Sequence, residues 1–138
     1  MYLNPVLKEA YSKEHLTARE AQAKAEWIAW GPIVFQVSRL MKKFGILEML
    51  RNSDNGMTEA EVAEQAGLSR YAAKVMLEAS ICIGTVLIDP ETDRYTLSKT
   101  GWCFITDPAT DVNTEFNHDV NYEGWFHLEE SLKEGRPV

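Results

Sequence analysis

The side chains best suited to chemistry gather near the C-terminal end of the sequence. They are the two histidines and four carboxylates His118, Asp119, Glu123, His127, Glu129 and Glu130. Zinc or iron would need such ligands on one face and at close spacing. The spacing of the two histidines matches no common metal motif. We therefore expect no metal site and interpret these residues as solvated helix and loop side chains.

Nucleophilic catalysis has no better support. Neither Cys82 nor Cys103 has a histidine nearby in the sequence, and no serine lies in a nucleophile-elbow context. Both cysteines stand among apolar residues, which is typical of buried, reduced thiols in a cytoplasmic protein rather than of a disulfide or half a metal site. We predict no catalytic residue in this chain.

Composition describes an ordinary folded protein. The chain has 138 residues, 45% of them hydrophobic and 25% charged, which suffices for about one domain with a real core. No apolar run approaches the roughly 18 residues of a membrane span, and no signal peptide opens the sequence. The expected location is the cytoplasm, without membrane contact.

The elements that must position these side chains are organised around residues 56–97. Thr58 and Glu61 form a capping box that begins a short helix, and Gly67 supplies the left-handed residue that ends it. Ser69 can cap a second helix, on which one face is shared by Ala72, Val75, Met76 and Ala79. Two short helices joined by a tight turn predict a helix-turn-helix.

A β-hairpin follows the second helix. Val86–Ile88 and Arg94–Leu97 have strand character, and the residues between them, Asp89–Asp93, are typical of a turn. A helix-turn-helix followed by such a hairpin predicts a winged helix. The fold class is therefore mainly α with a small β-hairpin wing.

Charge argues against DNA as the partner of this winged helix. The chain carries a net charge of −7, whereas affinity for DNA comes largely from phosphate neutralisation by Lys and Arg. The helix-turn-helix offers Arg70 and Lys74 against the acidic residues Glu59, Glu61, Glu64 and Glu78. We favour a packing module. The alternative is a winged-helix transcription regulator in which Arg70 and Lys74 contact DNA, and a third possibility is an interaction module that uses the acidic surface.

The N-terminal residues predict a long amphipathic helix. Asn4 can cap it, Pro5 suits its first position, and the pattern continues to about Trp30. Its apolar stripe is rich in alanine, which permits close approach of another helix: Leu7, Tyr11, Ala18, Ala21, Ala25 and Ile28. Such a helix has little in its own chain to cover it. We expect a subunit interface, the alternative being that it folds back on the winged helix.

Gly31-Pro32 interrupts the helical pattern. A second helix then has one apolar face, formed by Ile33, Val37, Leu40, Met41 and Phe44. Gly45 ends it, and Ile46–Leu50 is expected to be a short apolar helix. This apolar region is the centre of the monomer core, the middle of a dimer interface, or both.

After the wing, Ser98 can cap a helical turn that Thr106–Pro108 stops. Residues 109–121 are polar and acidic and predict a loop followed by a helix, and Tyr122–Glu134 predicts another helix. The whole chain divides into dimerisation helices at 1–55, the winged helix-turn-helix at 56–106 and a helical connector at 107–138.

Several segments in this order resemble a known family. They are Phe44–Leu50, Met57–Ala63, Gly67–Ser69, Tyr95–Gly101, Trp125–Leu128 and Leu132–Pro137. The order resembles the N-terminal winged-helix dimerisation domain of S-adenosylmethionine-dependent O-methyltransferases of the acetylserotonin, caffeate and polyketide-tailoring type. No single segment is decisive, but repressors have no reason to carry the closing Trp…Leu…Gly-Arg-Pro run.

The resemblance implies a homodimer held through the helices of residues 5–44, and a methyl transfer to a small-molecule oxygen, less readily nitrogen, in the full-length enzyme. The family's cofactor domain is a Rossmann-like unit with a glycine-rich loop. The glycines here are scattered singly, so this chain is expected to bind no S-adenosylmethionine, to lack the catalytic domain and to be inactive alone.

The resemblance also implies that this domain helps to wall the acceptor pocket. The candidates are Phe116, Asn117, His118, Tyr122, Trp125 and Phe126. Asn117 and His118 suit an acceptor hydroxyl, because they are polar residues beside aromatic ones. The alternative for Trp125 and Phe126 is that they simply pack against the missing domain.

Overall fold

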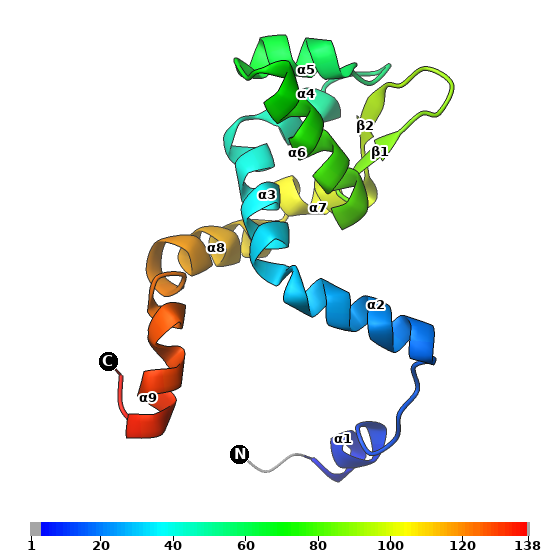
Figure 1. The fold of residues 1–138 in the computed structure, drawn as a ribbon. Helices are drawn as coiled ribbons and strands as arrows, with labels where there is room; N and C mark the ends of the chain where they lie inside the picture. The colour runs from blue at the N-terminus through cyan, green and yellow to red at the C-terminus, as the bar shows by residue number, and fades with distance from the viewer. Residues whose placement is uncertain (1–3, 138) are drawn as a thin grey trace. The chain divides into compact units, whose positions relative to one another are not determined.

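The computed structural model describes residues 4–137, and the chain ends at 1–3 and 138 lie outside them. Residues up to Ile33 and residues from Val34 onward form two compact units. Most of the described chain is helical, and its one sheet is a two-stranded antiparallel hairpin, as the sequence predicts (Figure 1).

The first unit contains two helices where one long helix was predicted, so that prediction is wrong. Helix α1 is Pro5–Ala10, and helix α2 is Ala18–Ala29. Between them the Glu14 carboxylate accepts hydrogen bonds from the backbone N–H groups of His15 and Leu16, both at 2.8 Å. Thr17 and Glu20 then form a capping box that starts α2. Local side-chain acceptors have replaced helical hydrogen bonds across the break.

Helices α1 and α2 bury no residue. The large apolar side chains Trp27, Ile28 and Trp30 are all substantially exposed. Helix α2 ends at Ala29 with Trp30 as its C-cap, next to the predicted break, and α3 begins at Gly31.

The second unit is built on α3, Gly31–Lys43, of which residues from Val34 belong to it, and on α4, Ile46–Arg51. Gly45 separates the two helices with a φ of 72°, as expected for a glycine that ends a helix. Val37 and Met41 of α3, and Ile46, Leu47 and Leu50 of α4, all enter the core. The predicted second helix and short apolar helix are both confirmed.

Helix α5 is Glu59–Ala66, and helix α6 is Arg70–Ile83. The Thr58–Glu61 capping box, the left-handed Gly67 and the Ser69 cap are all present as predicted. The predicted buried face of α6 is wrong by one position, because Ala73, Leu77 and Ser80 are buried while Val75 is exposed. Apolar residues surround most of α6, so periodicity alone does not choose between adjacent faces.

Strands β1, Val86–Ile88, and β2, Tyr95–Leu97, pair antiparallel with Val86 opposite Leu97. An additional bridge, which the sequence did not predict, joins Met57 to Tyr95 through two backbone hydrogen bonds of 2.9 and 2.7 Å. The Arg94 guanidinium donates to the carbonyl oxygen of Gly56 and to Glu61. The hairpin is thereby attached to the turn that precedes α5.

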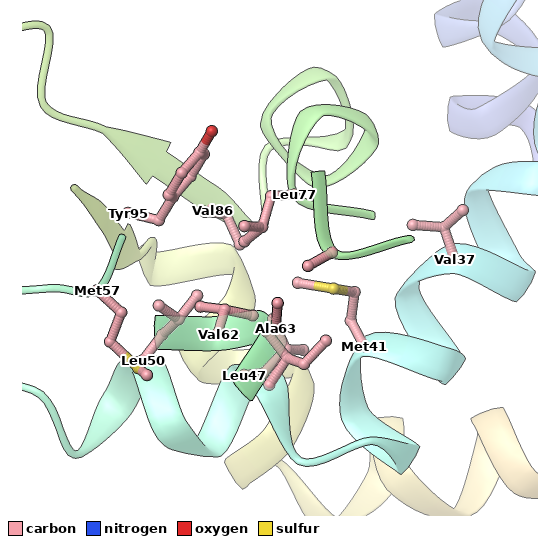
Figure 2. Packing of buried hydrophobic residues seen from close by; sticks show 12 residues of the cluster. Val37, Met41, Leu47, Leu50, Met57, Val62, Ala63, Leu77, Val86 and Tyr95 are labelled. Carbon is pink, nitrogen blue, oxygen red and sulfur yellow. The ribbon is translucent and has the colours of Figure 1, made fainter. Parts of the chain in front are cut away.

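The core lies between α3, α4, α5, α6 and the hairpin. Figure 2 shows Met41, Leu47, Val62, Leu77 and Val86 pointing toward one another from these five elements. These five side chains are completely buried. Burial of this apolar surface is the main stabilisation of the second unit.

Helix α7, Lys99–Thr106, begins at the predicted Ser98 cap. The loop predicted after it is wrong. Asp107 caps the next helix by accepting from the Thr110 backbone N–H, and Pro108 takes its first position, so α8 runs over Pro108–Phe116. Pro108 therefore follows the end of α7 and is also the first residue of α8.

The predicted helix over 122–134 is also interrupted. A π-helical turn at Asn117–Asn121 continues α8, a 3₁₀ turn follows at Gly124–His127, and α9 is Leu128–Glu134. Cys82 and Cys103 are free thiols as predicted but exposed rather than buried. Cys82 lies on α6 and Cys103 on α7. The residues that these helices bury are different ones, Leu77 on α6 and Gly101 on α7.

Loss of the α5 cap gives the first testable expectation. Thr58→Ala removes the hydroxyl that accepts from the Glu61 backbone N–H and should lower the free energy of unfolding by about 1 kcal/mol. Thr58→Ser, which keeps the hydroxyl, should restore most of it. Urea unfolding followed by circular dichroism measures both, and equal stability of the Ala and Ser variants would contradict the capping role.

Replacing Ser80 is expected to raise the free energy of unfolding, whereas replacing Thr58 lowers it. Its side chain is fully buried, and its hydroxyl finds no hydrogen-bond partner among the described residues. A buried polar group without a partner is costly, whereas an apolar group of similar size is not. Ser80→Ala should therefore raise the free energy of unfolding, by about 1 kcal/mol. A loss of stability in the same urea experiment would show that the hydroxyl is satisfied in solution.

Candidate functional site

Three of the predicted pocket residues, His118, Tyr122 and Trp125, form an aromatic cluster with Tyr122 at its centre. The Tyr122 ring stacks on Phe35 of α3 with centroids 5.5 Å apart and lies 5.6 Å from Trp125. The His118 ring also stacks on Tyr122, with centroids 6.3 Å apart. The cluster therefore joins α3 to the segment after α8, and all its members belong to the second unit.

The backbone that carries this cluster is irregular. The π-helical turn at Asn117–Asn121 widens the helix, and such turns recur at functional sites. Across it the Asn121 amide donates to the Asn117 side-chain oxygen at 3.0 Å. Asn117 and His118 are both half-buried.

His118 is oriented by its neighbour. Its Nδ1 lies 2.7 Å from Asp119 Oδ1. The hydrogen bond from His118 is the main cause that lowers the pKa of the Asp119 carboxyl, with the charges of His118, Arg39 and Lys43 adding to it. A carboxylate that holds one ring nitrogen fixes the orientation of the imidazole and leaves Nε2 as its free nitrogen.

Ion pairs attach α8 to α3. Arg39 lies 3.1 Å from Glu115 and 3.9 Å from Asp119, and Lys42 pairs with Asp111 and with Glu115. Burial opposes the charged form of Lys42, but its hydrogen bonds to the two carboxylates outweigh this and raise its pKa. These contacts hold the aromatic cluster against the domain.

The structure brings together three of the six predicted pocket residues, His118, Tyr122 and Trp125. Phe116, at the end of α8, is 53% exposed and is not one of the rings in the cluster. Asn117 lies beside them in the π turn. Phe126 is 83% exposed and forms no ring pair among the described residues, so it stands apart from the cluster. Sequence reasoning missed Phe35 and Arg39, although the acidic residues at four-residue spacing on α8 could have indicated a basic partner helix.

The side chains considered for DNA contact are engaged with acidic neighbours. Arg70 Nε lies 3.2 Å from Glu59, and Lys74 lies 3.8 Å from Glu78. Both pairs are exposed, so each is worth little energetically. They nevertheless leave no concentrated positive charge on α6.

A groove lies between α4 and the start of α5. The open groove of about 600 Å³ is lined by Gly45, Glu48, Met49, Asn52, Ser53, Gly56, Met57, Glu61, Gln65 and Arg94. The Arg94 guanidinium in it is already bound to backbone carbonyls and Glu61. The groove results from the attachment of the hairpin to the turn that precedes α5. The sequence did not predict it.

Protonation of Asp119 is expected to make the stability of the protein depend on pH. Its folded-state pKa is lowered, so its contribution to stability is present above the unfolded value of about 3.9 and is lost as pH falls through the folded value. Asp119→Asn should therefore lower the melting temperature at pH 6 and have progressively less effect below about pH 4. Melting curves of both proteins at several pH values test this, and a difference that persists unchanged at pH 2 would contradict it.

Within residues 4–137, no three His, Cys, Asp or Glu side chains are grouped so that they could hold a metal ion. Nor, in the same residues, is any helix both long and apolar enough to cross a membrane.

The model of the Dimerisation2-like domain family matches residues 22–95, which is more than half of the chain. The chain belongs to the Dimerisation2-like domain family. This match confirms the resemblance stated from the sequence, and it includes α3 to α6 and most of the hairpin. The aromatic cluster is carried mainly by residues beyond the matched range.

Solved structures share the fold of this Dimerisation2-like chain. The S-adenosylmethionine-dependent methyltransferase SibL has 20% identity and a TM-score of 0.69, over 79% of this chain and 32% of its own. Human N-acetylserotonin methyltransferase, solved in complex with SAM, has 18% identity and a TM-score of 0.69, over 91% and 36%. A structure described as a pericyclic reaction enzyme has 14% identity and a TM-score of 0.72, over 96% and 32%.

The Dimerisation2-like chain thus spans about a third of the length of these structures. At these identities the comparison establishes the fold alone: two of the three proteins are named as methyltransferases and the third as a pericyclic reaction enzyme. A search of curated protein sequences found no match.

Proposed function

We propose that this chain is the dimerisation and substrate-pocket domain of a S-adenosylmethionine-dependent methyltransferase. Methyl transfer, to an oxygen of a small molecule, would take place in a Rossmann-like domain supplied by a longer protein. The observation that carries this proposal is the alignment of 91% of the chain with about a third of a SAM-bound methyltransferase. Membership of the Dimerisation2-like family supports the dimerisation part.

The residues of this chain do not fit the cofactor. S-adenosylmethionine sites of this kind need a parallel sheet with a glycine-rich loop between a strand and a helix. The described residues contain only an antiparallel pair, and the β1–β2 turn carries Asp89, Glu91 and Asp93 in place of glycines. We therefore assign no reaction step to this chain and expect it to be inactive alone. Its contribution is to position the acceptor and to exclude water.

We further propose that two copies associate through the helices of residues 5–44. The absence of buried residues in α1 and α2 supports this, because an amphipathic helix normally buries its apolar side. In this arrangement the exposed side chains Trp27, Ile28 and Trp30 would be covered in the dimer.

In the same proposal, α5, α6 and the hairpin form a winged helix that serves as a packing module. The Met57–Tyr95 bridge supports it, because it attaches the residue that precedes the helix-turn-helix to the hairpin. The acidic partners of Arg70 and Lys74 make DNA contact by these residues less favourable. Asn117, His118, Tyr122 and Trp125 would line the acceptor pocket, with Phe126 packing against the additional domain.

The decisive experiment is the intact mass of the native gene product. We expect a protein larger than 15.7 kDa by about one further domain, roughly 200 residues, that binds S-adenosylmethionine in calorimetry. A native product with the mass of this chain would overturn the methyltransferase proposal.

The transcription-regulator alternative is tested separately. We expect no retardation of DNA by this chain in a gel at low salt, where electrostatic binding is strongest. If retardation occurs and the double variant Arg70→Glu/Lys74→Glu abolishes it, the regulator becomes the better proposal. The acidic interaction module would lead if the native chain is short and DNA does not bind.

A further inference from the structure

One turn of α3 reaches the His118 imidazole through two different partners. Phe35 stacks on Tyr122 with ring centroids 5.5 Å apart, and Tyr122 in turn stacks on the His118 ring at 6.3 Å. Four residues after Phe35, Arg39 lies 3.9 Å from Asp119, whose Oδ1 is 2.7 Å from His118 Nδ1. Residues four apart share one face of a helix, so a single face of α3 supports both the ring plane and one ring nitrogen of His118.

The proton between His118 and Asp119 belongs to the imidazole. The hydrogen bond from His118 is the main cause that lowers the pKa of the Asp119 carboxyl, so at neutral pH this carboxyl is ionised and has no proton to donate. At a distance of 2.7 Å, Nδ1 must then be the donor. In a neutral imidazole with its proton on Nδ1, the other nitrogen, Nε2, carries a lone pair and accepts hydrogen bonds.

The Asp119 carboxylate needs a partner to stay in this position. Its side chain is 62% exposed, so on its own it is free to turn toward water and release the ring. The Arg39 side chain is only 11% exposed, and its guanidinium is held in place by Glu115 at 3.1 Å. Salt and water screen a nearly buried cation less than an exposed one, so the attraction of Arg39 for Asp119 favours the orientation that contacts the ring.

The second ring nitrogen of His118 is available to a ligand. Within residues 4–137, Nε2 makes no hydrogen bond, and the side chain is 33% exposed. It belongs to the cluster that we propose as a wall of the acceptor pocket. An acceptor nitrogen in this place can receive a proton donor such as an O–H group, but it has nothing to offer to an ether oxygen.

We propose that Arg39 is a positioning residue: acting through Asp119, it holds His118 in the tautomer whose Nε2 accepts a hydrogen bond from a hydroxyl of the acceptor molecule. The inference rests on the proposed function and adds to it the class of acceptor, one that presents an O–H group to the aromatic cluster. A methyl ether has no such proton, so the site distinguishes a hydroxyl compound from its methylated form.

The tautomer is measured directly by nitrogen-15 NMR of the imidazole rings in the whole chain. At about pH 8.5, above the usual histidine pKa of about 6.5, neutral rings are observed, and we expect the His118 proton on Nδ1. His127 is the internal reference, because its Nδ1 lies 3.9 Å from Glu130, too far for a hydrogen bond, and it should show the tautomer mixture of a free ring. The same mixture at His118 would overturn the proposal.

Substitution of Arg39 tests its role as a positioning residue. Arg39→Met keeps most of the side-chain length and removes the charge, and the ratio of Nδ1–H to Nε2–H tautomer at His118 should fall about threefold or more. Asp119→Ala, which removes the acceptor itself, marks the complete loss. Arg39→Lys, which keeps the charge, should restore most of the ratio. Lys42 still pairs with Glu115 in these variants and keeps α8 attached to α3.

Arg51→Met is the matched control for Arg39→Met. Arg51 also pairs with a carboxylate, that of Glu48 at 3.3 Å, but it lies on α4 and not against the π turn. Its replacement should leave the His118 tautomer ratio unchanged. Equal changes in the two variants, or no change in Arg39→Met, would overturn the positioning role.

Phenol and anisole test the hydrogen bond that Nε2 accepts. Both probes have an aromatic ring that can stack on aromatic side chains, and they differ in whether the oxygen carries a proton or a methyl group. We expect phenol to shift the His118 Nε2 signal at least about threefold more than anisole does. Equal shifts, or no shift with phenol, would overturn the assignment of Nε2 as the atom that receives the hydroxyl.

These outcomes are separate from the test of the methyltransferase proposal, because all of them are observed in this chain alone. A native product without a further domain would overturn the proposed function and the methyl acceptor with it, while a fixed His118 tautomer would still establish the role of Arg39. A tautomer mixture at His118 together with a native product of the expected larger mass would overturn this inference only.

Discussion

Gly101→Ala is expected to destabilise the second unit by about 3 kcal/mol, an unusually large cost for one methyl group. A Cβ at Gly101 would lie 2.2 Å from the Thr85 carbonyl oxygen and 2.6 Å from Leu97 Cδ1. The Thr85 carbonyl accepts a hydrogen bond from the Ser98 backbone N–H, so it cannot move without disturbing the start of α7. The added methyl group must therefore displace backbone rather than a flexible side chain.

Gly124→Ala is the matched control, because a Cβ there meets no atom within 4 Å and the glycine does not have a positive φ. It should be neutral or slightly stabilising. Urea unfolding followed by circular dichroism at 222 nm compares the two. A cost for Gly101→Ala within about 0.5 kcal/mol of the control would show that α7 packs less closely against the hairpin than the structure indicates.

Leu77→Ala is expected to cost about 3 kcal/mol, within the range for a leucine that leaves a cavity in a rigid core. Leu77 is fully buried on α6 and contacts the core formed with Val86 and Met41 (Figure 2). The neighbouring elements come from distant parts of the chain, so they cannot collapse freely into the space. The same unfolding experiment measures the loss.

Val75→Ala provides the control for Leu77, since it removes apolar carbon from the exposed side of the same helix. We expect a change below about 1 kcal/mol. A larger effect at Val75 than at Leu77 would restore the buried face that was predicted from the sequence and contradict the one in the structure.

The sequence predicted the parts of the fold that depend on neighbouring residues. The caps at Thr58, Ser69 and Ser98, and the glycines at 45 and 67, act within one helical turn, so their types and spacing suffice. The same short range accounts for the hairpin turn. Local chemistry of this kind is independent of where the rest of the chain lies.

Prediction of the structure from the sequence was wrong or incomplete where two local interactions competed, or where a residue distant in the sequence determined the local structure. At Glu14 the carboxylate accepts from the backbone and breaks a helix that periodicity alone would continue. Asp107 and Pro108 were interpreted as a stop signal but also begin α8. The Met57–Tyr95 bridge joins residues far apart in sequence, which no local pattern records.

The candidate site was predicted in part for the same reason. The family resemblance implies His118, Tyr122 and Trp125 as pocket residues of one segment, and they do lie together. Phe35 and Arg39 complete the cluster from α3, and their role depends on tertiary packing.

The Met57–Tyr95 bridge has a consequence for how the second unit folds. It closes a loop that contains all of α5, α6 and β1, so the two ends of this segment are fixed to each other through backbone hydrogen bonds. Closing a long loop is entropically costly and delays folding, but once it is closed the enclosed helices cannot unravel separately. Hydrogen exchange at Met57 and in α6 should then proceed through one common opening, as a single cooperative unit of the native state.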